Sequence, residues 1–382
     1  MVDQQRLFNE FIELVKTDSE TGDEREICDL LKGKLTALGF EVVEDDSAEK
    51  TGHGAGNLVA TLNGTLDNAP KIYFTCHMDT VAPGKGIKPI LKDGYFESNG
   101  TTILGSDDKA GLAALMEGIR LMKEQNIPHG QIQLVITAGE ESGLAGSRHL
   151  DTSLVDADFG FAIDSNGPVG EIIISAPSQV KIFTTIHGKA AHAGVNPEDG
   201  ISAIQVASRA ISKMRLGRID SETTANVGFF KGGTASNVVP DKVEIVSEAR
   251  SRNEIKLKAQ VKHMEKTFKE VAEEFGARAE VETRVLYPSF KFSEEDLVVK
   301  KAIAAVEKIG RTPKVTVSGG GSDANVMAGY GFPTVNLGIG YENIHTTSER
   351  MPVKELIKAV ELVLALIEES AKVPSGSTEV TQ

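Results

Sequence analysis

Residues 134–146 read LVITAGEESGLAG, and this stretch predicts both the fold class and the site of the chain. The apolar run 134–136 indicates a short buried strand, and two adjacent carboxylates, Glu140 and Glu141, follow soon after it. In an open α/β sheet the loops after the strands face a common crevice, where binding sites are built. Two neighbouring carboxylates repel one another there unless a cation or a shared proton lies between them. A solvated surface loop with two acids is the simpler explanation of this stretch. Whether it forms a binding site must therefore be judged from the other segments of the chain.

Strands and helices alternate on both sides of this stretch. Before residue 176 the residue patterns predict helices at 4–16, 23–38 and 108–125, and strands at 41–44, 57–62, 71–76, 131–136, 159–163 and 171–175. The alternation resumes late in the chain, with helices at 294–309 and 353–370 and strands at 314–317 and 334–337. This order predicts an α/β fold, with a mixed sheet covered by helices on both faces.

The pattern changes between Pro177 and Pro288. About one hundred residues there read as strand, helix, strand, strand, helix, strand, which is the split βαβ arrangement of ferredoxin-like α+β domains. We therefore expect an inserted lid domain at 178–287 and a discontinuous catalytic domain made of 1–177 and 288–372. The small polar residues at 373–382 predict a disordered tail.

Charge and composition exclude several classes of partner. The 382 residues carry a formal net charge of −14, which argues against nucleic acid and against an anionic membrane surface. Two cysteines, Cys28 and Cys76, cannot form a disulfide framework and fit a reducing compartment. The N-terminus lacks the apolar core of a signal peptide, and no run of 18 apolar residues occurs. We expect a cytoplasmic protein without a membrane segment.

Further potential metal ligands stand at other predicted strand ends and at a helix start. His77 and Asp79 occur in CHMDTV, Asp107 in SDDKAG, Asp164 in FAIDS and His345 in NIHTT. Each has an ordinary structural explanation by itself, because acids cap helices and lone histidines are usually not ligands. Together they form an inventory of imidazoles and carboxylates that suits two zinc ions.

The motifs HMDTV, GSDDKAG, GEESG, FAIDS and NIHTTSE, in this order, resemble the family of di-zinc exopeptidases and deacylases. That family includes peptidase T, carnosinase, glutamate carboxypeptidase, aminoacylase and succinyl-diaminopimelate desuccinylase. The resemblance spans the chain except its tail, and five motifs in a fixed order are hard to obtain by chance. The segments DDKAG and HGKAAHAG are most similar to the peptidase T branch, whose members are tripeptide aminopeptidases.

The resemblance implies a role for each residue of the inventory. Two Zn²⁺, replaceable by Co²⁺ or Mn²⁺, would share Asp107, the acid two residues before Lys109, as a bridge. One ion would also be held by His77 and Asp164, and the other by Glu141 and His345. The resemblance further makes Glu140 the general base and Asp79 the residue that orients His77. The residues alone do not decide which of the two glutamates binds metal.

The resemblance also implies substrate contacts from the inserted segment, namely His192, Asn237 and Arg250. An arginine makes chemical sense there as a fork for a peptide carboxylate, although a surface ion pair is the simpler explanation for Arg250. The protein would be a monomer, or a homodimer formed through the lid.

Three functions stay open at this point. The first is an aminopeptidase on short peptides, with the extra acid Asp108 attracting the free α-amine of the substrate. The second is a deacylase of the same family that hydrolyses N-acyl amino acids or succinyl amides. The third, from a different class, is a peptide-binding module with a catalytically dead site, against which the intact ligand set argues.

Overall fold

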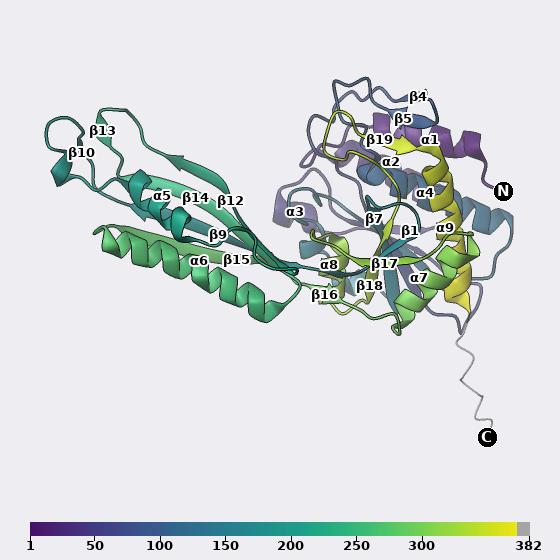
Figure 1. Cartoon of the computed structure of the whole chain (residues 1–382). Coiled ribbons are helices and arrows are strands. Elements are labelled where there is room, and N and C mark those ends of the chain that lie inside the picture. The colour runs from purple at the N-terminus through teal and green to yellow at the C-terminus, as the bar shows by residue number, and fades with distance from the viewer. Residues whose placement is uncertain (373–382) are drawn as a thin grey trace. The chain divides into compact units, whose positions relative to one another are not determined.

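The computed structural model describes residues 1–372, and the predicted disordered tail at 373–382 lies outside the described residues. The chain divides into two compact units, whose elements are labelled in Figure 1. The first unit comprises Met1–Ile174, Phe292–Val317 and the chain from Ser322 onward, and the second comprises Ser175–Lys291 and Ser318–Gly321. The domain limits 177 and 288 lie within a few residues of these bounds and remain a prediction.

The first unit is built on a nine-stranded sheet of order β1-β2-β6-β3-β7-β18-β8-β16, in which β17 also pairs with β8. By residue range, β16 and the end of β8 fall within the second unit. The four strands β6, β3, β7 and β18 are parallel neighbours, whereas β1, β2, β8 and β16 pair antiparallel. The predicted mixed sheet is therefore confirmed. Its strands are β1 (Glu41–Glu44), β2 (Leu58–Leu62), β3 (Ile72–His77), β6 (Ile132–Thr137), β7 (Phe159–Ser165), β8 (Glu171–Ala176), β16 (Phe290–Lys291), β17 (Lys314–Val317) and β18 (Thr334–Gly338).

Alternate residues of the central strands enter two different apolar cores, because successive side chains of a strand point to opposite faces. In β3, Phe74 packs in the larger core and Tyr73 in the smaller one. Helices thus cover both faces of the sheet, as predicted. They are α1 (Gln4–Lys16), α2 (Arg25–Ala37), α3 (Ser47–Thr51), α4 (Ser106–Glu124), α7 (Leu297–Lys308), α8 (Asp323–Gly329) and α9 (Val353–Ala371). No helix within residues 1–372 is long and apolar enough to cross a membrane.

Helix α4 lies deep in the larger core, with nearly every residue from Ser106 to Met122 buried. It packs against α9, α1 and β3. Gly118 permits the close approach to α9, because a Cβ there would lie 2.7 Å from Val363 Cγ1. The start of this helix is therefore a rigid place from which to present a side chain.

A three-stranded sheet of β4 (Ile90–Lys92), β5 (Tyr95–Glu97) and β19 (Arg350–Pro352) completes the first unit. Asp93 and Gly94 form the turn between β4 and β5, and both lie in the left-handed region that a two-residue hairpin turn requires. Strand β19 follows the loop that holds His345 and was not predicted.

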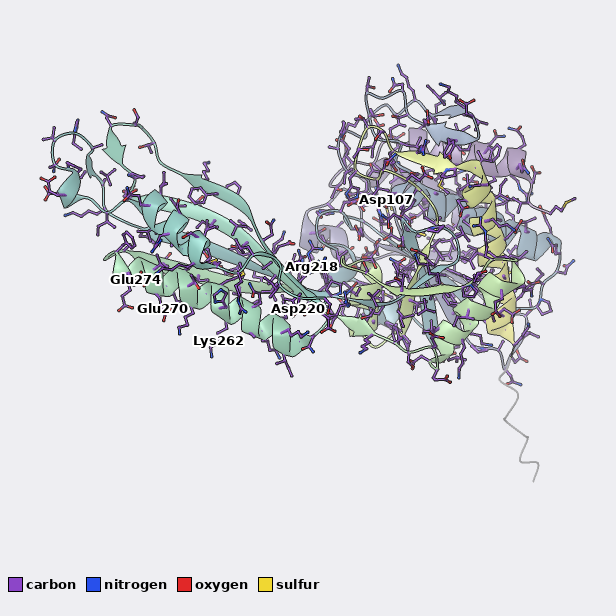
Figure 2. All side chains as sticks on the ribbon, viewed as in Figure 1. Asp107, Arg218, Asp220, Lys262, Glu270 and Glu274 are labelled. Carbon is purple, nitrogen blue, oxygen red and sulfur yellow. The ribbon has the colours of Figure 1, made fainter. Side chains whose placement is uncertain are left out.

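The second unit is a five-stranded antiparallel sheet of order β11-β12-β14-β9-β15 with two helices packed on it. Apart from the additional two-residue strands β10, β11 and β13, its order of strands and helices along the chain is the predicted ferredoxin-like one. Exposed charged side chains such as Lys262, Glu270 and Glu274 line α6 (Figure 2). The elements are β9 (Ser178–His187), β10 (Ala191–His192), α5 (Ala203–Lys213), β11 (Gly217–Arg218), β12 (Thr223–Gly232), β13 (Val238–Val239), β14 (Lys242–Ser251), α6 (Glu254–Glu274) and β15 (Arg278–Tyr287).

Candidate metal centre

The predicted ligands come from one edge of the parallel part of the sheet. His77 ends β3, Asp164 lies at the end of β7, and Glu141 follows β6 in the next loop. Because these strands are parallel neighbours, their carboxyl ends meet at the same edge. His345 arrives from the loop after β18, and Asp107 arrives from the first turn of α4.

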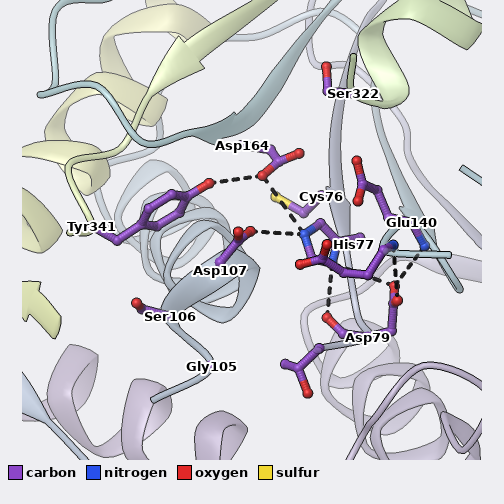
Figure 3. A network of polar contacts seen from close by, with 12 residues as sticks. Cys76, His77, Asp79, Gly105, Ser106, Asp107, Glu140, Asp164, Ser322 and Tyr341 are labelled. Atoms are coloured by element: carbon purple, nitrogen blue, oxygen red, sulfur yellow. Dashed lines mark hydrogen bonds and ion pairs between the residues drawn. The ribbon is translucent and has the colours of Figure 1, made fainter. Parts of the chain in front are cut away.

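Asp107 lies between the two imidazoles, with one carboxylate oxygen toward each. Figure 3 shows the side of Asp107 that faces His77. Its Oδ1 is 3.0 Å from His77 Nε2, and its Oδ2 is 3.3 Å from His345 Nε2. On the first side, His77 Nε2 is also 3.8 Å from Asp164 Oδ1. On the second side, His345 Nε2 is 2.9 Å from Glu141 Oε1. The structure therefore brings all five predicted ligands together in two groups that share Asp107.

The donor set fits divalent metal ions. One ligand atom each of His77, Asp107 and Glu141 lies within 4.8 Å of the others. Imidazole nitrogen and carboxylate oxygen are the donors that zinc, cobalt and manganese accept. All five side chains are mostly buried except His345, whose side chain is 48% exposed.

Electrostatics also favours a cation here. Burial disfavours the charged imidazole of His77, but hydrogen bonds with Asp107 and Asp79 outweigh it and hold the pKa of His77 well above its usual value. Hydrogen bonds to Asp107 and Glu141 raise the pKa of His345 to about 10. Burial and the neighbouring carboxylates raise the pKa of both Glu140 and Asp164 well above the usual range. A bound divalent cation would supply the positive charge that these carboxylates lack.

Asp79 holds the loop of the two glutamates. Its Oδ1 accepts the backbone N–H of Glu140 at 2.9 Å, and its Oδ2 accepts the N–H of Glu141 at 3.3 Å and the hydroxyl of Thr21 at 2.7 Å. His77 Nδ1 is 2.9 Å from the main-chain oxygen of Asp79 and 3.5 Å from its carboxylate. Asp79 therefore contacts both His77 and the glutamate loop, which is more than its predicted role.

Glu140 and Glu141 are adjacent but differ in their contacts. Glu141 faces His345, as described above, whereas the Glu140 carboxylate makes no hydrogen bond with any residue in 1–372. Glu140 is half-buried and close enough to His77, Asp164 and Asp323 to feel their charges. A carboxylate so placed is free to accept a proton from a reacting group.

Asp108 is not accessible to a substrate, which overturns the expectation that it attracts a substrate amine. Its carboxylate is completely buried and lies beside Cys76 and Gly111, and burial raises its pKa well above the usual value. The neighbouring Lys109 is also completely buried, and its amine donates to the carbonyl of Thr17 at 2.7 Å.

The three predicted substrate contacts all belong to the second unit, and their roles remain predictions. His192 is exposed on β10, and its Nδ1 accepts the N–H of Gly194. Asn237 is exposed in the loop before β13. Arg250 on β14 forms the ion pair that the simpler explanation expected, with its Nε 2.8 Å from Glu248 Oε1.

Two residues that contact the site were not predicted from the sequence. The hydroxyl of Tyr341, a buried residue, donates to Asp164 Oδ1 at 2.9 Å. Glu349 accepts hydrogen bonds from the turn that carries Asp107. Glu349 ends the NIHTTSE motif and could have been found there, whereas nothing in the sequence around Tyr341 indicates its role.

Comparison with known proteins gives a consistent result. The family model described as "Peptidase family M20/M25/M40" matches residues 73–369. The uncharacterized protein YqjE of Bacillus subtilis is 58% identical over 372 residues, which cover 97% of this chain and 100% of that protein. Peptidase T of Clostridium novyi is 26% identical over 401 residues, which cover 94% of this chain and 98% of that protein.

Two solved structures are similar over nearly their whole length. The aminopeptidase PepT of Bacillus cereus has a TM-score of 0.91 and 60% identity, covering 97% of this chain and 100% of that chain. A tripeptidase of Staphylococcus aureus has a TM-score of 0.94 and 51% identity, covering 97% of this chain and 99% of that chain.

Proposed function

Because the chain belongs to peptidase family M20/M25/M40, we propose that it is a dinuclear metal aminopeptidase that removes the N-terminal residue of short peptides, tripeptides above all. The family assignment makes it a peptidase. The finer substrate assignment is supported by its identity of 60% and 51% to chains described as an aminopeptidase and a tripeptidase.

The observation that carries the metal part of this proposal is the position of Asp107. Its two oxygens face two imidazoles, and each imidazole has a second carboxylate beside it. One ion would be held by His77, Asp107 and Asp164, and the other by Glu141, Asp107 and His345. Zinc is the proposed native metal, and Co²⁺ and Mn²⁺ accept the same donors.

Bound metal ions would polarise the scissile carbonyl and lower the pKa of a water molecule. A side chain of the protein carries out the proton transfers. Glu140 takes the proton from the attacking water and then donates it to the leaving amine, a role for which its carboxylate, free of hydrogen bonds with residues 1–372, is available. Asp79 holds the backbone of Glu140 in place, and Tyr341 fixes the orientation of Asp164.

The remaining assignments follow from the same proposal. His192, Asn237 and Arg250 would contact substrate from residues 178–287, which would act as a lid or as the contact between two copies. A cytoplasmic location agrees with the absence of a membrane-spanning helix within residues 1–372 and with peptide substrates.

A substrate panel tests the proposal. The full chain, supplied with Zn²⁺, Co²⁺ or Mn²⁺, is given tri-alanine, N-acetyl-tri-alanine, N-acetyl amino acids and N-succinyl diamino acids. We expect tri-alanine to yield alanine and di-alanine, and the acetylated tripeptide to stay intact. Faster turnover of the acyl amino acids would support the deacylase instead, and binding of tri-alanine without turnover would support the dead module.

A further inference from the structure

The carboxylate of Glu349 accepts four hydrogen bonds from one turn of the chain. Oε2 accepts the N–H groups of Leu104 and Gly105, each at 2.9 Å. Oε1 accepts the hydroxyl of Ser106 at 2.6 Å and the N–H of Asp107 at 3.1 Å. Glu349 is only 2% exposed, so these four donors replace the water that a carboxylate would otherwise bind.

The four donors belong to the turn that presents Asp107. The first N–H groups of a helix lack partners within the helix, and α4 begins at Ser106, next to Gly105 in the left-handed conformation. Asp107 itself has a non-helical backbone, with φ −84° and ψ 103°. One of the three N–H groups that Glu349 accepts is therefore that of Asp107, the proposed bridging ligand, which lies on the same turn as Gly105 and Ser106 (Figure 3).

Glu349 also ends the loop that carries His345, four residues earlier. That loop is closed by its own hydrogen bonds, from Glu349 N to Thr346 O at 3.1 Å and from Thr346 Oγ1 to Asn343 O at 2.7 Å. The carboxylate thus joins a short, internally bonded loop to the turn of Asp107. The loop and the turn that Glu349 joins carry His345 and Asp107, and His345 Nε2 lies 3.3 Å from Asp107 Oδ2.

We propose that Glu349 is a positioning residue, whose carboxylate fixes the His345 loop against the Asp107 turn and so sets the spacing of these two metal ligands. The inference rests on the proposed function, since it takes both side chains to bind metal. The four donors require a side chain that accepts hydrogen bonds at both of its terminal atoms, and only a carboxylate does so, because both of these atoms are oxygens. A glutamine would place its NH₂ group against two of the four donors and lose their hydrogen bonds.

The test is Co²⁺ binding by the full chain after removal of metal with a chelator. Visible absorption reports the geometry around Co²⁺ and its affinity, and circular dichroism shows that each variant is folded. For Glu349→Gln we expect the affinity for at least one Co²⁺ to fall by about 10- to 100-fold, the usual effect of losing a group that orients a ligand, together with an altered spectrum at saturation. Ser106→Ala removes one donor and should shift affinity in the same direction by less.

Glu342→Gln is the matched control, because Glu342 lies near the same loop and its half-exposed carboxylate pairs with Arg350 instead of with the Asp107 turn. It should bind Co²⁺ as the unaltered chain does. A purely structural Glu349 would lower the unfolding temperature but leave the affinity and spectrum of the folded protein unchanged, and that result would overturn the inference. If Glu349→Gln does not fold, unchanged Co²⁺ binding by Ser106→Ala overturns it instead. An unaltered chain that binds no Co²⁺ would refute the proposed function, and the inference with it.

Discussion

Asp79 Oδ1 lies 2.9 Å from the backbone nitrogen of Glu140, and this hydrogen bond joins the segment after His77 to the loop of the two glutamates. The same carboxylate accepts the N–H of Glu141 and the hydroxyl of Thr21. One buried acid thus holds the proposed base and a proposed ligand in their places.

Replacing Asp79 with asparagine should impair catalysis while leaving the fold intact. The amide oxygen can still accept from Glu140 or from Glu141, but the NH₂ group that replaces the other oxygen cannot accept a hydrogen bond. We expect kcat to fall by about 10- to 100-fold, as for other groups that orient a metal site. Steady-state kinetics measures this, with Thr21→Ala as a milder variant. Wild-type kcat in Asp79→Asn would show that the hydrogen bonds do not matter for turnover.

Glu140→Gln and Glu141→Gln form a matched pair in one loop. Glu140→Gln should keep its metal and lower kcat by about 10²- to 10⁴-fold, the usual contribution of a general base. Glu141→Gln should instead lose metal, because it removes a carboxylate from the His345 side of the site. Elemental analysis beside kinetics distinguishes the two, and exchanged phenotypes would mean that the roles of the glutamates are reversed.

Tyr341→Phe removes only the hydroxyl that donates to Asp164. We expect metal affinity to fall by about 10-fold, measured by competition with a chromophoric chelator. Tyr330→Phe is the control, because the Tyr330 hydroxyl donates only to backbone carbonyls, those of Ser147 and Arg148. Equal metal affinities of Tyr341→Phe and Tyr330→Phe would show that the Tyr341 hydroxyl does not contribute to metal binding.

Gly139→Ala should distort the loop just before Glu140. Gly139 has φ +66°, and an added Cβ would lie 1.9 Å from His53 Cε1. The left-handed conformation alone costs a residue with a side chain about 1–2 kcal/mol, and the clash adds to this. Denaturant unfolding should show the loss, and His53→Ala in the same chain should restore the part due to the clash. A double variant no more stable than Gly139→Ala would argue against the clash.

The sequence predicted the larger features because their patterns are strong. Strand 131–136 and the motif residues that follow it lie where the apolar run and the Glu-Glu pair indicated, and the five predicted ligands converge. Parallel strands bring motifs that are distant in the sequence to one edge of the sheet. The positions of the motifs after successive predicted strands were therefore enough to predict that these ligands lie together.

Other features depend on tertiary contacts that a sequence does not display. Asp108 looks as available as Asp107, but its carboxylate is completely buried beside Cys76. Tyr341 looks like a core residue, and only the structure shows its hydroxyl on Asp164. The short strand β19 exists because it pairs with β5, an element far away in the chain.

The metal content of Asp107→Ala tests the central claim most directly, since Asp107 is proposed to serve both ions. The unaltered chain, purified and dialysed against Zn²⁺, should hold two ions per chain by elemental analysis. The variant should hold one or none. Two ions retained per chain in the folded variant would contradict the shared carboxylate and the account of the site built on it.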